Sequence, residues 1–197
     1  MKKKETEFLT EEEAAAILRI PDRRTLQGKR DYAILLTLLT TGLRKAEVCS
    51  LKVKDVKTYR NQAVIDVVGK GNRFRRLPLK GETLLSIQEY LKASKNGTNP
   101  DHALFRTLGK HGPYEQAGLT PKAVDCLVKS AAKKALIRKR IHPHVVRHTF
   151  ATTLLDKGVD LKTVQDLLGH SHIRTTERYL HSTDDRKVEA IERLQFG

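Results

Sequence analysis

Histidines are concentrated in the last third of the chain, where six of the eight lie between positions 142 and 181. His144 and His148 are four residues apart on a predicted helix, the spacing at which zinc proteases place two ligands on one helix face. Arg147 stands beside His148, however, and no glutamate occupies the position of the catalytic base, which argues against zinc. Two interpretations remain: the histidines are packing or surface residues, or they act together with nearby arginines.

Cationic and proton-transferring side chains gather in four segments, at positions 41–47, 69–71, 144–148 and 168–179. Two arginines would clamp the equatorial oxygens of a phosphoryl transition state bidentately, which a lysine cannot do as a point charge. A tyrosine would supply a nucleophile that stores the phosphodiester covalently. A lysine or histidine would protonate the leaving 5′-hydroxyl. Together these groups predict phosphoryl transfer at a phosphodiester without a metal ion.

Three of these segments resemble the motifs of the tyrosine recombinases, the phage-integrase family. The first arginine motif is matched by TTGLRKAEV at 40–48, the HxLRHTFAT motif by HPHVVRHTFAT at 142–152, and the LGHSSIxTTxxYxH motif by LLGHSHIRTTERYLH at 167–181. They stand in the family's order and span most of the chain. Val146 replaces the usual leucine before the second arginine, and we expect this to change packing and not chemistry.

The resemblance implies catalytic roles for the matching residues. Arg44 and Arg147 would bind the non-bridging oxygens of the scissile phosphate. Tyr179 would attack the phosphorus, which gives a 3′-phosphotyrosine link and a free 5′-hydroxyl. The link conserves the energy of the broken bond, so the resemblance implies neither a metal nor any other cofactor.

The resemblance also implies which residues transfer protons and which hold the catalytic groups in position. Lys70, in the Gly-Lys-Gly turn, would be the general acid, although a lysine in an exposed turn often has no function. His144 would assist proton transfer, and His170 would hydrogen-bond the phosphate and pack under the nucleophile. Glu47 lies three residues beyond Arg44, where a helix neighbour can orient an arginine or simply form a solvated ion pair.

The elements that must position these residues are mostly helical. A capping box at Thr10 and Glu13 predicts a helix to Leu18, and Pro121 predicts the first position of another. Further helices are expected at 29–39 and 43–49 and through most of the chain after position 81, with loops at 96–100 and 109–113. The runs 63–68 and 74–79 flank a glycine-rich turn and predict a hairpin, with a partner strand near 53–56. The prediction is an α+β fold, mainly helical with one small antiparallel sheet, as the catalytic-domain fold of the tyrosine recombinases implies.

The charge balance indicates a polyanionic partner. The 197 residues include 38 Lys and Arg against 23 Asp and Glu, a formal net charge of +15. Each phosphate neutralised by such a side chain releases condensed counterions, which favours nucleic acid over the acidic membranes or proteins that charge alone also allows. The partner we expect is double-stranded DNA, bound by a chain that is a monomer when free and a tetramer on DNA.

Composition excludes several other classes. No apolar run approaches the roughly 20 residues that cross a bilayer, and no apolar segment follows the basic start as in a signal peptide. Cys49 and Cys126 form no CxxC pair, which excludes a disulfide framework and a thiolate zinc site. We therefore expect a cytoplasmic, nucleoid-associated protein.

Basic residues around the motifs are expected to contact DNA phosphates, which fix register without reading sequence. About half of such runs are ordinarily just solvated surface. The expected contacts are Arg24, Arg30, Arg73, Arg75, Arg76, Lys133, Lys134, Arg138 and Arg140.

We expect a basic N-terminal tail at 1–9, the catalytic domain at 10–183 and a C-terminal helix at 184–197. Val188, Ile191 and Leu194 form an apolar stripe on that helix, which either docks on a neighbouring subunit or packs on its own domain. Many integrases also carry an N-terminal helical domain that clamps the opposite face of DNA. The sequence leaves open whether such a domain has been removed or is naturally absent.

The function that the sequence predicts is site-specific DNA recombination of the integrase type. One alternative is a topoisomerase-like enzyme that relaxes DNA by the same chemistry without exchanging partner sites. Another is an accessory DNA-binding protein that has kept the fold and lost the reaction. Against the second alternative, every polar residue expected in the catalytic site is present.

Overall fold

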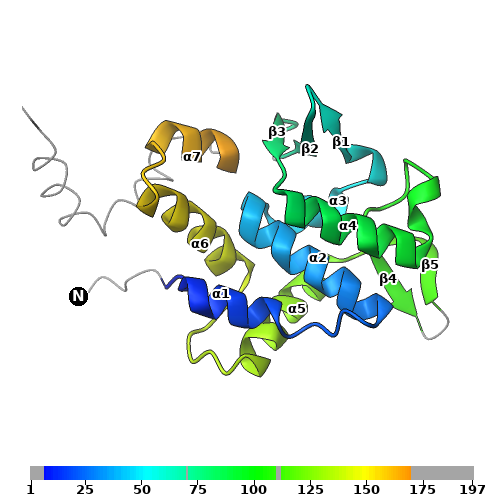
Figure 1. Cartoon of the computed structure of the whole chain (residues 1–197), viewed down its shortest axis with the longest axis horizontal. Coiled ribbons are helices and arrows are strands. Elements are labelled where there is room, and N and C mark those ends of the chain that lie inside the picture. Colours follow the sequence, from blue (N-terminus) through cyan, green and yellow to red (C-terminus); the bar gives the residue numbers. More distant parts are fainter. Residues whose placement is uncertain (1–6, 70, 110–111, 170–197) are drawn as a thin grey trace, which may run out of the picture.

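The computed structural model describes residues 7–69, 71–109 and 112–169, and Figure 1 gives their arrangement. The helices are α1 (Glu11–Leu18), α2 (Leu26–Thr41), α3 (Lys45–Ser50), α4 (Gly81–Ser94), α5 (Pro121–Lys134), α6 (Pro143–Asp156) and α7 (Leu161–Leu168). Two single 3₁₀ turns occupy Val53–Asp55 and Asn96–Thr98. The strands are β1 (Val56–Tyr59), β2 (Gln62–Val68), β3 (Phe74–Pro78), β4 (Arg106–Gly109) and β5 (Gly112–Gly118).

Helix α2 runs through the middle of the fold and packs against α4 and α6 (Figure 1). It is longer than the predicted 29–39, because the Thr25 hydroxyl caps its first turn and Gly42 ends it in the left-handed conformation. Its central turns are buried nearly all round, and Ile34, Leu35 and Leu38 are among the least exposed side chains in the core. The helix therefore serves as the rigid support on which the following short helix, α3, is placed.

The capping predictions are confirmed. The Thr10 hydroxyl accepts from the Glu13 backbone N–H, and the Glu13 carboxylate accepts from the Thr10 N–H. Pro121 is the first residue of α5, after the capping residue Thr120. Local sequence therefore fixes where these two helices begin.

The predicted hairpin is confirmed as β2 and β3, and β1 completes an antiparallel sheet of order β1-β2-β3. The predicted position of the partner strand, near 53–56, is too early in the chain. Val53–Asp55 forms a 3₁₀ turn, and β1 begins at Val56. The reason is that Val53 and Lys54 donate their backbone N–H groups to the 100–102 segment instead of to β2.

A second, two-stranded sheet was not predicted. Strands β4 and β5 pair where the sequence indicated helix with a loop at 109–113, so that interpretation is wrong. Both strands carry glycine, and their register shifts between Arg106 and Leu108, so neither has the clean alternation by which a strand is recognised. The fold class is nevertheless confirmed: α+β, mainly helical, with small antiparallel sheets.

The core is one large cluster around α2 with a smaller one between α6 and α7, which contains Phe150, Leu155 and Leu168. Of the predicted tail at 1–9, the described residues pack on the domain: Leu9 is 2% exposed, and its N–H donates to the Thr149 hydroxyl. Within the described ranges, no helix is both long and apolar enough to cross a membrane.

Candidate functional site

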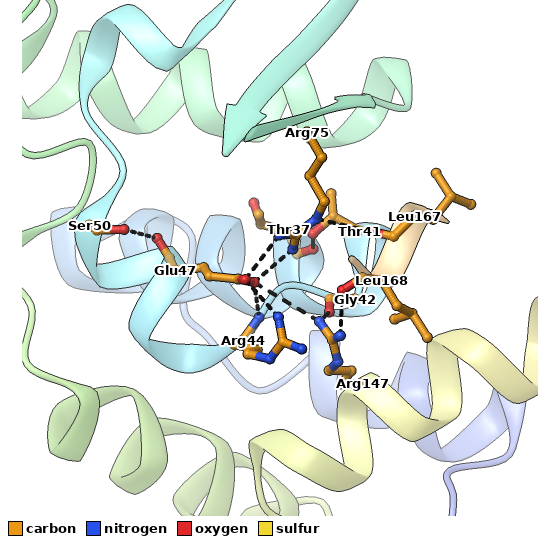
Figure 2. Close-up of polar contacts among 10 residues, drawn as sticks. All are labelled: Thr37, Thr41, Gly42, Arg44, Glu47, Ser50, Arg75, Arg147, Leu167 and Leu168. Atoms are coloured by element: carbon orange, nitrogen blue, oxygen red, sulfur yellow. Dashed lines mark hydrogen bonds and ion pairs between the residues drawn. The ribbon is translucent and has the colours of Figure 1, made fainter. Parts of the chain in front are cut away.

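Glu47, on α3, lies at the centre of a cluster of arginines and is only 5% exposed (Figure 2). Its carboxylate accepts from Arg44 Nη1 at 2.9 Å and from the Arg44 backbone N–H at 2.7 Å. It also accepts a bidentate pair from Arg75, with Nη1 at 3.0 Å and Nη2 at 2.7 Å. Burial acts to raise the pKa of Glu47, but the hydrogen bonds from Arg75 and Arg44 outweigh it and hold the pKa below its ordinary value. Glu47 is therefore a buried anion and not a solvated helix partner.

The two arginines predicted to clamp a phosphate converge on this carboxylate from different elements. Arg44 is the residue before α3, and its side chain is 33% exposed. Arg147, on α6, is 5% exposed and lies with Nη1 4.0 Å from Glu47 Oε2. Segments far apart in sequence therefore place two guanidinium groups side by side, as phosphate binding requires.

Gly42 makes this arrangement possible. At φ +62° it ends α2 and turns the chain toward Arg44, and its carbonyl accepts from Arg147 Nη1 at 2.6 Å. A Cβ atom at this position would lie 2.4 Å from Cδ1 of Phe150, so a side chain would displace α6 or the turn. Glycine is thus required both by the backbone conformation and by the close approach of α6.

The C-terminal end of α7 is held by two arginines. Arg147 Nη2 donates to the Leu168 carbonyl at 2.6 Å, and Arg75 Nε donates to the Leu167 carbonyl at 3.1 Å. The last carbonyls of a helix have no partner within it and carry partial negative charge, so cations are stabilising there. Gly169 follows at φ +63°. The chain therefore leaves α7 from a point tied directly to the arginine cluster.

Arg75 was expected among the DNA contacts, but its guanidinium is turned inward and its side chain is 11% exposed. The alternation of side chains along β3 could have predicted this inward orientation, because Arg75 lies on the same face of the strand as the buried Leu77. Arg76, on the opposite face, instead pairs with Asp66. Sequence reasoning missed the part that Arg75 plays in the site.

His144 lies in the first turn of α6, close to the arginines. Although the residue is exposed, its pKa is lowered, first by partial desolvation and then by the nearby basic groups, which include Arg147 and Arg44. The imidazole is therefore neutral at neutral pH and able to accept a proton. His148 points elsewhere, with its ring edge-to-face against Phe8 at a centroid distance of 6.2 Å. Among the residues that the structure describes, no group of three His, Cys, Asp or Glu side chains is placed to hold a metal ion.

Three of the predicted catalytic residues, Lys70, His170 and Tyr179, lie outside the described residues. Two of them follow described glycines, Gly69 and Gly169. Between these glycines is a small cleft of about 300 Å³, lined by hairpin residues and by the end of α7.

The remaining predicted DNA contacts differ in how they are held. Arg30 pairs with Asp31 and is 13% exposed, and Arg24 pairs with Asp22. Those on the open surface are Arg24, Arg73, Lys133, Lys134, Arg138 and Arg140. Four of these lie in or just after α5, where Lys133, Arg138 and Arg140 border a shallow hollow.

Glu47→Gln is expected to lower the free energy of unfolding by about 3 kcal/mol at neutral pH, because it leaves buried guanidinium groups without their anion. The deficit should shrink below about pH 4. There the wild-type carboxylate, whose pKa is depressed in the folded state, loses its charge as the pH falls through that pKa. Urea unfolding at several pH values measures both effects.

Asp66→Asn is the matched control, because Asp66 is 9% exposed and also pairs bidentately with an arginine, Arg76. Both variants should be less stable than the wild type. Only Glu47→Gln should also slow any reaction of the site, by about a hundredfold, through displacement of the arginines. Equal activities in the two variants would show that Glu47 serves the fold alone.

Comparison with known proteins agrees with the motifs. A family model described as the phage integrase family matches residues 7–186, a range that includes Lys70, His170 and Tyr179. A tyrosine recombinase from Pseudothermotoga lettingae is 38% identical over 170 residues, covering 86% of this chain and 56% of that protein. Tyrosine recombinase XerA from Pyrococcus horikoshii is 37% identical over 188 residues, covering 95% of this chain and 61% of that protein. The chain thus spans less than two thirds of the length of these relatives.

Solved structures share the fold. The crystal structure of XerA recombinase matches with a TM-score of 0.79 at 27% identity, over 100% of this chain and 66% of that chain. A post-cleavage complex of XerH site-specific recombinase with a palindromic difH substrate matches with a TM-score of 0.78 at 27% identity, over 96% of this chain and 54% of that chain. With the arginine cluster, the ordered motifs and a family match over nearly the whole length, the chain belongs to the phage integrase family, the tyrosine recombinases.

Proposed function

We propose that this chain is the catalytic unit of a site-specific DNA recombinase, which cuts and rejoins DNA through a 3′-phosphotyrosine intermediate. The observation that carries the proposal is the convergence of Arg44 and Arg147 on the buried carboxylate of Glu47. Arg44 is held by a hydrogen bond to this anion, and Arg147 is held beside it by the backbone carbonyls of Gly42 and Leu168. The two guanidinium groups therefore form a preorganised site for a phosphodiester, because they do not have to reorient during the reaction.

In the first step, the Tyr179 oxygen attacks the scissile phosphorus and the bond from phosphorus to the 5′-oxygen breaks. His144, which is neutral at neutral pH, accepts the tyrosine proton, and Lys70 donates a proton to the leaving 5′-oxygen. Arg44, with a third of its side chain exposed, faces the phosphate beside the more deeply placed Arg147. Attack by a 5′-hydroxyl on the phosphotyrosine reverses these steps and rejoins the strand.

The partner we propose is double-stranded DNA. Exposed cations in and after α5, at positions 133, 134, 138 and 140, support this, as does the net charge of +15. The structure of the Tn1549 transposon integrase, which is similar with a TM-score of 0.74 at 26% identity, is in complex with transposon right end DNA. We further propose that the chain is monomeric when free, assembles as a tetramer on DNA and acts on the nucleoid in the cytoplasm.

Covalent trapping tests the proposal. The protein is incubated with fragmented genomic DNA from its source in chelator and quenched with detergent, and the protein-linked ends are sequenced. We expect adducts at one sequence, with the DNA 3′ end on Tyr179 by peptide mass spectrometry and a 5′-hydroxyl that a kinase can label. Adducts at unrelated sequences, with relaxation of supercoiled DNA, would favour the topoisomerase-like alternative. Absence of any adduct despite DNA binding would favour the accessory protein.

A further inference from the structure

We propose that Arg75 is a positioning residue for strand cleavage, which locks the base of the hairpin turn that carries Lys70 against Glu47 and the end of α7. This inference rests on the proposed function, because it concerns how the general acid of that reaction is placed. It assigns to Arg75 a role different from the phosphate contact that its position in a basic run suggests.

The hydrogen bonds of Arg75 join three elements. Arg75 itself belongs to β3, its two terminal nitrogens donate to Glu47 on α3, and its Nε donates to the Leu167 carbonyl at the end of α7 (Figure 2). All three nitrogens of the guanidinium thus have acceptors within the protein. A lysine, with one nitrogen, cannot make this set of bonds.

The glycines on either side show how closely the backbone approaches this guanidinium. A Cβ atom at Gly69 would lie 3.1 Å from Arg75 Nη1 and 3.1 Å from Glu47 Oε1. A Cβ atom at Gly169 would lie 3.2 Å from both Cδ and Nη1 of Arg75. The side chain is therefore enclosed between the residue that precedes Lys70 and the residue that precedes His170. A displaced Arg75 side chain would therefore press on the backbone at Gly69, the residue before Lys70.

Arg76 shows that an arginine–carboxylate pair on this strand need not have such a role. It bonds to Asp66 on the neighbouring strand and stacks over the Tyr59 ring at 3.9 Å, so its contacts remain within the sheet. Arg75 differs because its acceptors belong to α3 and α7. Its contacts therefore fix the sheet relative to the arginines of the site.

The test compares the Arg75→Lys variant with the wild type on a nicked duplex that carries the sequence recovered by trapping. We expect the single-turnover rate of adduct formation to fall about a hundredfold, the scale that a misplacement of about 1 Å produces. DNA affinity should remain within about twofold, because Arg75 is not on the open surface. Gly69→Ala, which crowds the same guanidinium and leaves Arg75 itself unchanged, should slow cleavage in the same direction.

A second substrate separates a displaced general acid from general damage. It carries sulfur in place of the bridging 5′-oxygen, and a thiol of pKa about 8.5 leaves without being protonated. We expect Arg75→Lys to cleave this substrate within about fivefold of the wild-type rate, because it bypasses Lys70. An equal loss on both substrates would overturn the proposal.

Arg106→Lys controls for loss of a buried arginine elsewhere. Arg106 is 4% exposed and bonds to Asn96, and its substitution should lower thermal stability while leaving cleavage unchanged. The proposal is also overturned if Arg75→Lys cleaves within threefold of wild type, or if its defect is in DNA affinity, which would make Arg75 a phosphate contact. Failure of the proposed function is distinguishable, since then the wild type itself would give no adduct.

Discussion

Tyr179→Phe is expected to abolish the covalent protein–DNA adduct while DNA affinity stays within about twofold of the wild type. The substitution removes one oxygen, which is the atom that forms the bond to phosphorus, and leaves the ring. The arginines proposed to bind the phosphate are held by Glu47 and by backbone carbonyls, and neither support involves this hydroxyl. Denaturing gels measure the adduct, and fluorescence anisotropy with the same duplex measures affinity.

Two of the other four tyrosines, Tyr32 and Tyr90, are poorly suited to replace Tyr179 as the nucleophile. Tyr32 donates to Glu82 and the Tyr90 hydroxyl accepts from the Arg106 N–H, and burial is the first cause that raises the pKa of both. A raised pKa leaves less of the reactive phenolate at neutral pH. Tyr59 is 42% exposed, so Tyr59→Phe is the matched control and should form adduct normally. Adduct formation by Tyr179→Phe would mean that the nucleophile has been assigned wrongly.

Arg44→Ala is expected to slow adduct formation about a thousandfold at saturating DNA, the lower end of what an arginine on a transferring phosphoryl group contributes. This corresponds to about 4 kcal/mol of transition-state stabilisation. Folding should be less affected, because the bond from the Arg44 backbone N–H to Glu47 remains after the side chain is removed. Single-turnover kinetics with a nicked duplex measures the rate apart from binding.

Lys45→Ala provides the control for charge. Lys45 is the next residue, is 43% exposed and lies 4.0 Å from Asp125, so its removal also deletes one positive charge beside the site. We expect its cleavage rate to stay within a few fold of wild type, since a solvated charge is screened by water and salt. A result in which Arg44→Ala weakens affinity but keeps the saturated rate would assign Arg44 to DNA binding alone.

Much of the local structure could be predicted because it depends on neighbouring residues. The Thr10 cap and Pro121 at the start of α5 each use a preference that a few adjacent residues determine. The hairpin of β2 and β3 was also found, because glycines on both sides of position 70 favour a turn. Arg44 and Arg147 were identified through the resemblance to the family's motifs, and the structure brings them together.

What could not be predicted depends on contacts between distant segments. Glu47 was expected as a partner of Arg44, but its burial requires β3 and α6 to close over it. Arg75 is one basic residue among several in sequence, and only the end of α7 makes its environment different. The pairing of β4 with β5 lacks the alternating pattern that identifies a strand on its own. Each case is set by tertiary packing, which overrides local preference.

The net charge of the arginine cluster determines which state of the DNA it would stabilise most. Arg44, Arg75 and Arg147 surround the single carboxylate of Glu47, so these four side chains together carry two positive charges in excess. A phosphodiester carries one negative charge, and it gains a second as the deprotonated tyrosine oxygen adds to phosphorus. The excess therefore matches the pentacoordinate species better than the intact strand. In the proposed reaction, this excess of positive charge would favour the transition state over the bound substrate, and so would raise the rate without strengthening the binding of uncleaved DNA.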